Sequence, residues 1–225
     1  MAMLKRIWVH LRVLGKARRN RSDLLGWLGR RPQILVAQAA YESALLLTAR
    51  LDSELKMLAT AKAAAMANCE FCIDIGSALA GLDGMDERKF TDLRTYRDSD
   101  AYSELERLVI AFAEAMSATP AIVPAELRDE LLRHLSKAQL TELAAEVAWE
   151  NQRARLNQAL GVRPAGFADG AVCFLPETIV PPRAADARSA GLPGGQPADQ
   201  VGEHRAGVGD ERPGGVGEPV EQLGR

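Results

Sequence analysis

Apolar residues recur at every third or fourth position along most of residues 1–175, and this period predicts helices. No alternation of apolar and polar residues continues beyond a few positions, so nothing indicates a β-strand. Two pairs, Ser103 with Glu106 and Ser136 with Gln139, have the spacing of a capping box, in which side chains bind the unpaired amides at a helix start. We therefore predict an all-α fold.

Residues that cap or interrupt helices set the expected bounds. Asp52 or Ser53 can cap an alanine-rich helix, whose small side chains would let a neighbouring helix approach closely. Pro124 suits the first turn of another helix. The predicted helices are a basic N-terminal helix, one from Ser22 to before Pro32, one through Tyr41 to about Arg50, the alanine-rich helix, one from about Asn68 to Gly81, a short one near Glu87 to Leu93, and helices from Ser103 to about Met116, from Pro124, and from Ser136 to about Leu160.

The composition changes near Leu175. Beyond this residue there is no aromatic side chain, and glycine and proline interrupt the chain repeatedly. Such a segment cannot bury enough apolar surface to offset its ordering entropy. The chain is thus expected to have a helical domain over residues 1–175 and a disordered tail over residues 176–225.

Charge and cysteine content restrict the classes of function. The formal net charge of −2 gives no reason to expect a nucleic-acid partner. No apolar run is long enough to span a bilayer, and we expect the basic N-terminal helix to pack on the protein rather than on a membrane. Three cysteines do not form the framework of a secreted disulfide-rich protein. We therefore expect a cytoplasmic protein.

Two cysteines, Cys69 and Cys72, form a CxxC pair, and this is the motif with the most chemical content. Thiols at this spacing can close a disulfide, share a metal, or act as attacking and resolving groups. A purely structural role as small core residues is one alternative. Zinc is another, but it normally takes four ligands, and the other cysteine and the three histidines are scattered. We expect no metal and no organic cofactor.

The pair falls at a predicted helix start. Asn68 is a favourable N-cap residue, which would put Cys69 and Cys72 in the first turn, where free amides and the helix dipole stabilise a thiolate. On that helix Gly76 shares the face of the two cysteines. Because an internal glycine destabilises a helix, Gly76 is expected to leave space beside Cys72.

The stretches Leu51–Leu58 and Asn68–Gly76 resemble the carboxymuconolactone decarboxylase / alkyl hydroperoxidase D (AhpD-like) superfamily. Residues Glu150–Gly161, and the ending from Gly166 to Cys173, resemble a CxxC-bearing branch of it. The resemblance implies an all-α, homo-oligomeric protein. It also implies that Cys72 attacks a hydroperoxide, that Cys69 closes the disulfide, and that a dithiol reductant, which we cannot identify, restores both thiols.

The sequence departs from this family at two positions. A relay histidine normally follows the second cysteine by four residues, where this chain has Gly76, and a relay glutamate normally precedes the first by twelve, where it has Met57. Glu150 is a possible substitute, since it forms a polar stripe at helical spacing with Glu146, Arg153 and Asn157, although a solvated helix face would give the same pattern. Asp74 is a poorer candidate, because it points away from Cys72 on a helix.

We therefore predict a thiol-dependent oxidoreductase that reduces a hydroperoxide or a disulfide through a Cys69–Cys72 cycle. A lactone decarboxylase and a non-catalytic, redox-sensing helical oligomer remain alternatives. Cys173 is expected to be a spare buried thiol, and Tyr41, Glu42 and Trp149 are given no role.

Overall fold

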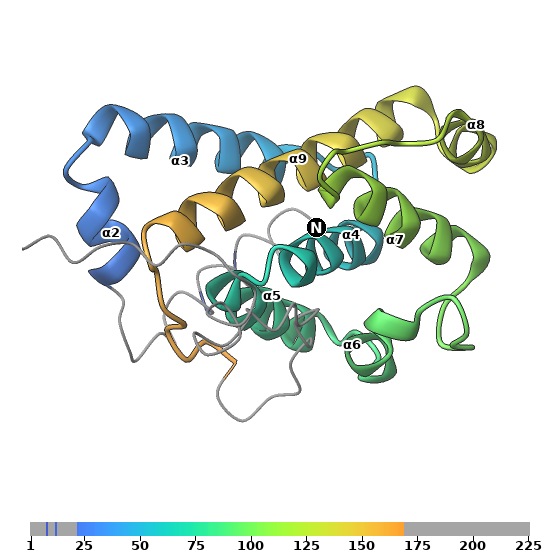
Figure 1. The fold of residues 1–225 in the computed structure, drawn as a ribbon, viewed down its shortest axis with the longest axis horizontal. Helices are drawn as coiled ribbons and strands as arrows, with labels where there is room; N and C mark the ends of the chain where they lie inside the picture. The colour runs from blue at the N-terminus through green and yellow to red at the C-terminus, as the bar shows by residue number, and fades with distance from the viewer. Residues whose placement is uncertain (1–7, 9–11, 13–21, 169–225) are drawn as a thin grey trace, which may run out of the picture. The chain divides into compact units, whose positions relative to one another are not determined.

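The computed structural model describes residues 22–168, together with Trp8 and Arg12, and in these residues every regular element is a helix (Figure 1). The all-α prediction is confirmed. The basic N-terminal helix, Cys173 and the tail over residues 176–225 lie outside the described residues, apart from Trp8 and Arg12. The elements are α2 (Ser22–Leu28), α3 (Pro32–Leu47), α4 (Ser53–Met66), α5 (Glu70–Asp83), α6 (Arg88–Thr91), the 3-10 turn η1 (Leu93–Thr95), α7 (Glu104–Ser117), α8 (Ala125–His134) and α9 (Lys137–Ala159).

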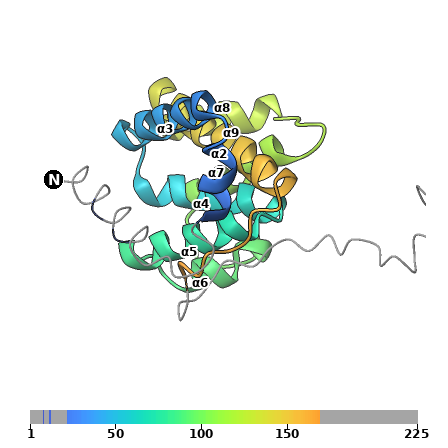
Figure 2. The same ribbon diagram turned by 90° about the vertical axis from the view of Figure 1, so that its left-hand side faces the viewer.

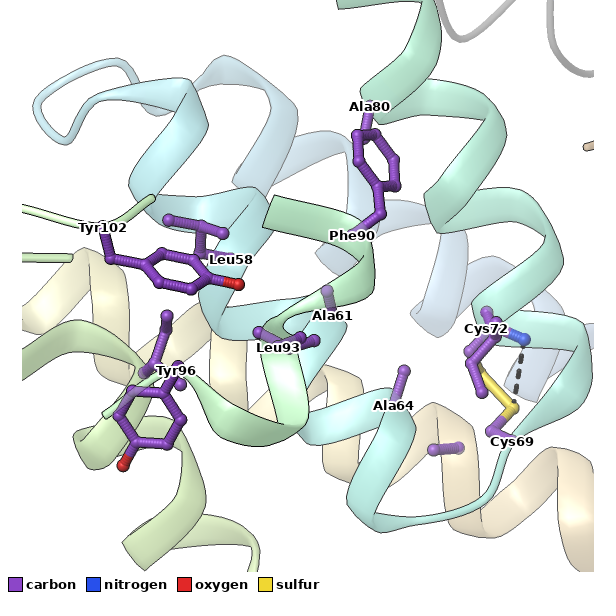
Figure 3. Close-up of a cluster of buried hydrophobic side chains, with 13 residues drawn as sticks. Leu58, Ala61, Ala64, Cys69, Cys72, Ala80, Phe90, Leu93, Tyr96 and Tyr102 are labelled. Carbon is purple, nitrogen blue, oxygen red and sulfur yellow. Dashed lines mark hydrogen bonds between the residues drawn. A yellow bond between two sulfur atoms is a disulfide. The ribbon is translucent and has the colours of Figure 1, made fainter. Parts of the chain in front are cut away.

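Helix α4 lies at the centre of the bundle and packs against α5, α7 and α9 (Figures 1 and 2). Its run of alanines explains this position, because small side chains let three helix backbones approach it. Ala59 and Ala63 face a core shared with α7 and α9, whereas Leu58 and Ala64 face a second core that includes both cysteines (Figure 3). The cysteine pair is thus part of the packed interior.

The predicted caps at Asp52, Ser103 and Ser136 are confirmed. The Asp52 carboxylate accepts a hydrogen bond from the Glu54 amide at 2.8 Å, and both capping boxes are complete. Pro124 is the N-cap of α8 rather than a residue of its first turn. Such a shift of one residue is usual at helix ends, because their last turns are irregular.

A buried ion pair joins α4 to α9. The Lys56 ammonium contacts the Glu142 carboxylate, and both side chains are only 4% exposed. Glu142 also accepts a hydrogen bond from the Arg50 amide at 3.0 Å, and Lys56 donates to the Thr48 carbonyl at 3.1 Å. These partners satisfy charges that would otherwise be costly to bury.

None of the helices in the described part of the chain is both long and apolar enough to cross a membrane.

Candidate active site at the Cys69–Cys72 pair

Cys69 and Cys72 are joined by a disulfide, with their Cα atoms 5.2 Å apart (Figure 3). The prediction that Asn68 caps the helix is wrong, because Asn68 adopts a left-handed backbone with φ of 50° and Cys69 is the N-cap of α5. The Cys69 sulfur accepts a hydrogen bond from the Cys72 amide at 3.2 Å. Cys72 therefore lies in the first turn, as expected, but Cys69 stands just before it.

The side-chain amide of Asn157, a residue of α9, lies against the disulfide. The Asn157 Nδ2 atom lies 3.6 Å from the Cys72 sulfur and 3.9 Å from the Cys69 sulfur. Asn157 is buried. An amide donor in a buried site stabilises a neighbouring thiolate, because a hydrogen bond to a charged group is strong where water is excluded.

A cavity of about 90 Å³ adjoins Cys72 but does not include Cys69. Most of its wall is apolar, and Met57 and Gly76 both contribute to it. The two positions at which the sequence departs from the family it resembles thus line this cavity. A Cβ atom added at Gly76 would meet nothing within 4 Å, which confirms that this glycine leaves open space. The lining residues are Glu42, Met57, Thr60, Ala61, Ala64, Cys72, Ile73, Ile75, Gly76, Leu79, Glu150 and Arg153.

Glu150 brings a carboxylate into the same cavity from α9. It is 2% exposed, and its Oε2 atom accepts a hydrogen bond from Arg153 at 2.5 Å. Its Oε1 atom is buried and has no hydrogen-bond partner among the described residues. Burial raises the pKa of Glu150 above its ordinary value, against the lowering effect of the Arg153 charge and hydrogen bond. A carboxylate of this kind is a suitable proton acceptor.

Arg153 is itself held by two carboxylates. Its guanidinium contacts Glu150 and donates to Glu42 of α3 at 2.9 and 3.0 Å. Burial by itself would lower the pKa of Arg153, but the charges and hydrogen bonds of the two glutamates raise it further above its ordinary value. Its positive charge is thus shared between these two glutamates.

Glu42 is a residue of the site that sequence reasoning missed. Its carboxylate also accepts a hydrogen bond from the Trp149 indole, and Tyr41 stacks on Trp149 with ring centroids 4.5 Å apart. These contacts fix α3 against α9. No sequence signal would have found Glu42, because its partners are more than a hundred positions away in the chain.

The polar stripe of α9 therefore faces inward, and the interpretation as a solvated face is wrong. Glu150 and Asn157 are buried, and Glu146 lies 3.5 Å from the Lys56 ammonium with a side chain only 13% exposed. α3 and α4 cover this face, which explains its burial.

Asp74 has a structural role away from the cavity. Its Oδ2 atom accepts hydrogen bonds from the amides of Ala165, Gly166 and Phe167, and its Oδ1 atom accepts one from Ala168, at 2.8–3.1 Å. The carboxylate therefore holds the segment after α9 against α5. This agrees with the prediction that Asp74 points away from Cys72.

Within the described part of the chain, no group of three or more histidine, cysteine, aspartate or glutamate side chains could hold a metal ion.

No protein-family model matches this sequence. The uncharacterized protein YnjA of Escherichia coli (strain K12) is 32% identical over 171 residues, which make up 76% of this chain and 89% of YnjA. The debrominase Bmp8 has the same fold, with a TM-score of 0.62 and 24% identity over 74% of this chain and 87% of that one. An uncharacterized peroxidase-related protein of Ralstonia eutropha JMP134, described as an alkylhydroperoxidase AhpD core, superimposes with a TM-score of 0.55 at 20% identity, over 63% of this chain and 76% of that one.

The chain belongs to the same family as YnjA, and it has the AhpD-like fold of these solved structures. A variant of Bmp8 in which one cysteine is replaced by alanine, in complex with 2,3,4-tribromopyrrole, is 27% identical to this chain. The match covers 62% of this chain and 75% of the Bmp8 chain, with a TM-score of 0.56. A debrominase and peroxidase-related proteins thus share this helical fold.

Proposed function

We propose that the protein is a thiol-dependent oxidoreductase that reduces an organic hydroperoxide through a Cys69–Cys72 dithiol/disulfide cycle. The observation that carries the proposal is the meeting of Cys72 and the buried Glu150 in one cavity, beside an amide that contacts both sulfurs. A nucleophile, a proton acceptor and a stabilising donor are the parts that such a reaction requires.

In the first step, the Glu150 carboxylate accepts the proton of the Cys72 thiol. The thiolate attacks the terminal oxygen of the hydroperoxide, the O–O bond breaks, and Cys72 becomes a sulfenic acid. The leaving alkoxide takes the proton from Glu150 and departs as an alcohol.

In the second step, the Cys69 thiolate attacks the Cys72 sulfur and displaces hydroxide. The proton released by Cys69 converts this hydroxide into water, and the S–S bond forms. The sum is one hydroperoxide and two thiols giving one alcohol, one water and one disulfide, so the electrons balance. A dithiol is then required to return the pair to its reduced state.

The walls of the cavity favour a hydroperoxide with an apolar substituent. Met57, Ile73, Ile75 and Leu79 line it, and a second cavity of about 100 Å³ shares several of its residues and continues towards α3. Burial of an apolar group there would contribute binding free energy of roughly 25 cal/mol per Å². A lactone decarboxylase is less well supported, since Arg153, the guanidinium of this cavity, is already paired with two carboxylates.

A thiol titration of the reduced protein before and after one equivalent of cumene hydroperoxide tests the proposal. We expect rapid loss of two thiols, none in Cys72→Ser, and arrest at the sulfenic acid in Cys69→Ser. Cys173→Ser is the matched control and should lose two thiols as fast as the wild type. Thiols that react no faster than free cysteine would contradict the peroxidase proposal, and a disulfide that forms without turnover by a dithiol would favour redox sensing.

Reductive debromination is a second candidate, favoured by the 27% identity to the Bmp8 complex with tribromopyrrole. The same dithiol can supply two electrons to a C–Br bond, giving C–H, bromide, a proton and a disulfide. Release of bromide from 2,3,4-tribromopyrrole with dithiothreitol as the reductant would support it. A rate equal to that of Cys72→Ser would exclude it.

The homo-oligomer implied by the family resemblance remains a prediction, as does the cytoplasmic location. Exposed apolar side chains on α2 and α3 are consistent with an oligomer, and light scattering of the purified protein would measure its mass. These side chains are Leu25, Trp27, Ile34, Val36, Tyr41 and Leu47.

A further inference from the structure

The two cysteines border different openings. Cys72 lines the cavity described above, whereas Cys69 lines a separate hollow of about 240 Å³. The two share no lining residue. The hollow is lined by Asn68, Cys69, Glu70, Asn157, Gln158, Gly161 and Val162.

The chemical character of the two openings differs as well. Four of the residues that line the hollow at Cys69 are polar, and one of these, Glu70, is exposed to solvent. The cavity at Cys72 is walled mainly by apolar side chains, and its polar groups are largely engaged in the contacts of Glu42, Glu150 and Arg153. An apolar oxidant and a polar reductant would therefore partition to opposite sides of the disulfide.

We propose that a small polar thiol enters the hollow beside Glu70 and Val162 and attacks the sulfur of Cys69, while the hydroperoxide reaches Cys72 from the other side. This proposal rests on the dithiol/disulfide cycle proposed above. It identifies the reductant as a low-molecular-weight hydrophilic thiol and gives each cysteine its own route to solvent.

The reduction step follows from thiol–disulfide exchange. The thiolate of the reductant attacks the Cys69 sulfur, the Cys69–Cys72 bond breaks, and its electron pair leaves on the Cys72 sulfur. Asn157 stabilises this new thiolate, because its Nδ2 atom lies 3.6 Å from the Cys72 sulfur. A second thiol then displaces Cys69 from the mixed disulfide. Two thiols are oxidised to one disulfide, and the protein regains both of its thiols.

Two routes have a practical consequence. Product alcohol does not have to leave the apolar cavity before the reductant can bind, because the reductant uses the other side. The hydroperoxide also does not compete with the reductant for one opening. Each half-reaction can therefore be blocked separately.

The test uses the reduced single-cysteine variants Cys72→Ser and Cys69→Ser, both with Cys173→Ser, and two reagents. 2-Hydroxyethyl disulfide is a small polar probe that forms the mixed disulfide of the reduction step in reverse. Cumene hydroperoxide is the apolar oxidant. We expect Cys69 to react with the polar disulfide about tenfold faster than Cys72 does, and the order to be reversed with the hydroperoxide.

Filling one opening at a time makes the test independent of intrinsic reactivity. Val162→Trp, with Glu70→Trp as a second variant if the first unfolds, should slow the polar disulfide about tenfold at Cys69 and leave the hydroperoxide reaction of Cys72 unchanged. Gly76→Leu should have the opposite pattern. Circular dichroism and the Tm report whether each variant folds.

The outcomes separate this inference from the proposed function. If neither thiol reacts with the hydroperoxide faster than free cysteine does, the proposed peroxidase activity fails. The disulfide reagent alone then decides the route, since it requires no hydroperoxide. Equal or greater reactivity of Cys72 towards 2-hydroxyethyl disulfide, or no effect of filling the hollow, would overturn the assignment of Cys69 as the entry point.

Discussion

Glu150 and Cys72 line the same cavity, although one lies in α9 and the other in α5. The family that the sequence resembles is expected to carry a relay histidine and a relay glutamate at the positions where this chain has Gly76 and Met57. Both positions border this cavity too. Glu150 is therefore the carboxylate that the proposed mechanism uses as the proton acceptor.

Replacement of Glu150 by glutamine should lower kcat/KM for an organic hydroperoxide by about 100-fold, because general-base catalysis typically contributes a factor of this order. In the wild type, activity should rise with pH as the carboxyl ionises. The midpoint should lie above 4.5, since the pKa of Glu150 is raised by burial. A pH–rate profile would measure this rise in activity, which should be absent in Glu150→Gln.

Glu146→Gln is the matched control, since Glu146 lies on the same helix one turn earlier and borders the adjoining cavity. The activity of Glu146→Gln should still rise with pH as it does in the wild type. Equal activity of Glu150→Gln and wild type at all pH values would remove Glu150 from the mechanism.

Insertion of a histidine at Gly76 should accelerate the loss of thiols by about tenfold, because an imidazole with a pKa near 6.5 would restore a base four residues after Cys72. An added Cβ meets nothing within 4 Å there, and the position lines the cavity beside Cys72. Gly76→Ala controls for the change in helix propensity. Stopped-flow measurement with cumene hydroperoxide gives the rate of thiol loss. Equal rates for the histidine and alanine variants would contradict the prediction.

Loss of the Asn157 amide should destabilise the thiolate form of Cys72 relative to its thiol form. In Asn157→Leu, which preserves approximate volume, the reduced protein should react with iodoacetamide at pH 7 about tenfold more slowly than the wild type, because a hydrogen bond to a charged group contributes about 1.5–3 kcal/mol. Gln152→Leu, on an exposed position of the same helix, should react like the wild type. Unchanged alkylation of Asn157→Leu would show that its contact with the sulfurs has no electronic effect.

Removal of the Glu142 charge should destabilise the protein by about 3 kcal/mol at pH 7, because the buried Lys56 ammonium loses its main partner. Burial favours a higher pKa for Glu142, but the hydrogen bond and charge of Lys56 lower the pKa below its ordinary value. A lowered pKa gives stability above the pKa of the unfolded chain, and this stability is lost as the pH falls through the folded value. The difference between wild type and Glu142→Gln should therefore shrink as the pH falls below about 4.

Urea unfolding at several pH values measures these free energies. Glu126→Gln, at an exposed position of α8, is the control and should change stability by less than about 0.5 kcal/mol. A constant difference between Glu142→Gln and wild type down to pH 3 would contradict the assigned pKa shift.

Much of the fold is local and was accessible from the sequence. The capping boxes at Ser103 and Ser136 fix helix starts through contacts within four residues, and the alanines of α4 predict a crowded position in the bundle. The predicted start of α5 is one residue too early. The choice between Asn68 and Cys69 as the N-cap depends on the left-handed backbone of Asn68, which no sequence pattern indicates.

The sequence by itself determined the CxxC pair, the face that Cys72 shares with Gly76, and the stripe of Glu150, Arg153 and Asn157, because these depend only on spacing along the chain. Only the tertiary structure decided that this stripe faces inward, that Asn157 contacts both sulfurs, and that Glu42 binds Arg153. The physical reason is that a helical period shows which residues share a face, whereas the burial of that face, and with it the pKa of Glu150, depends on the helices packed against it.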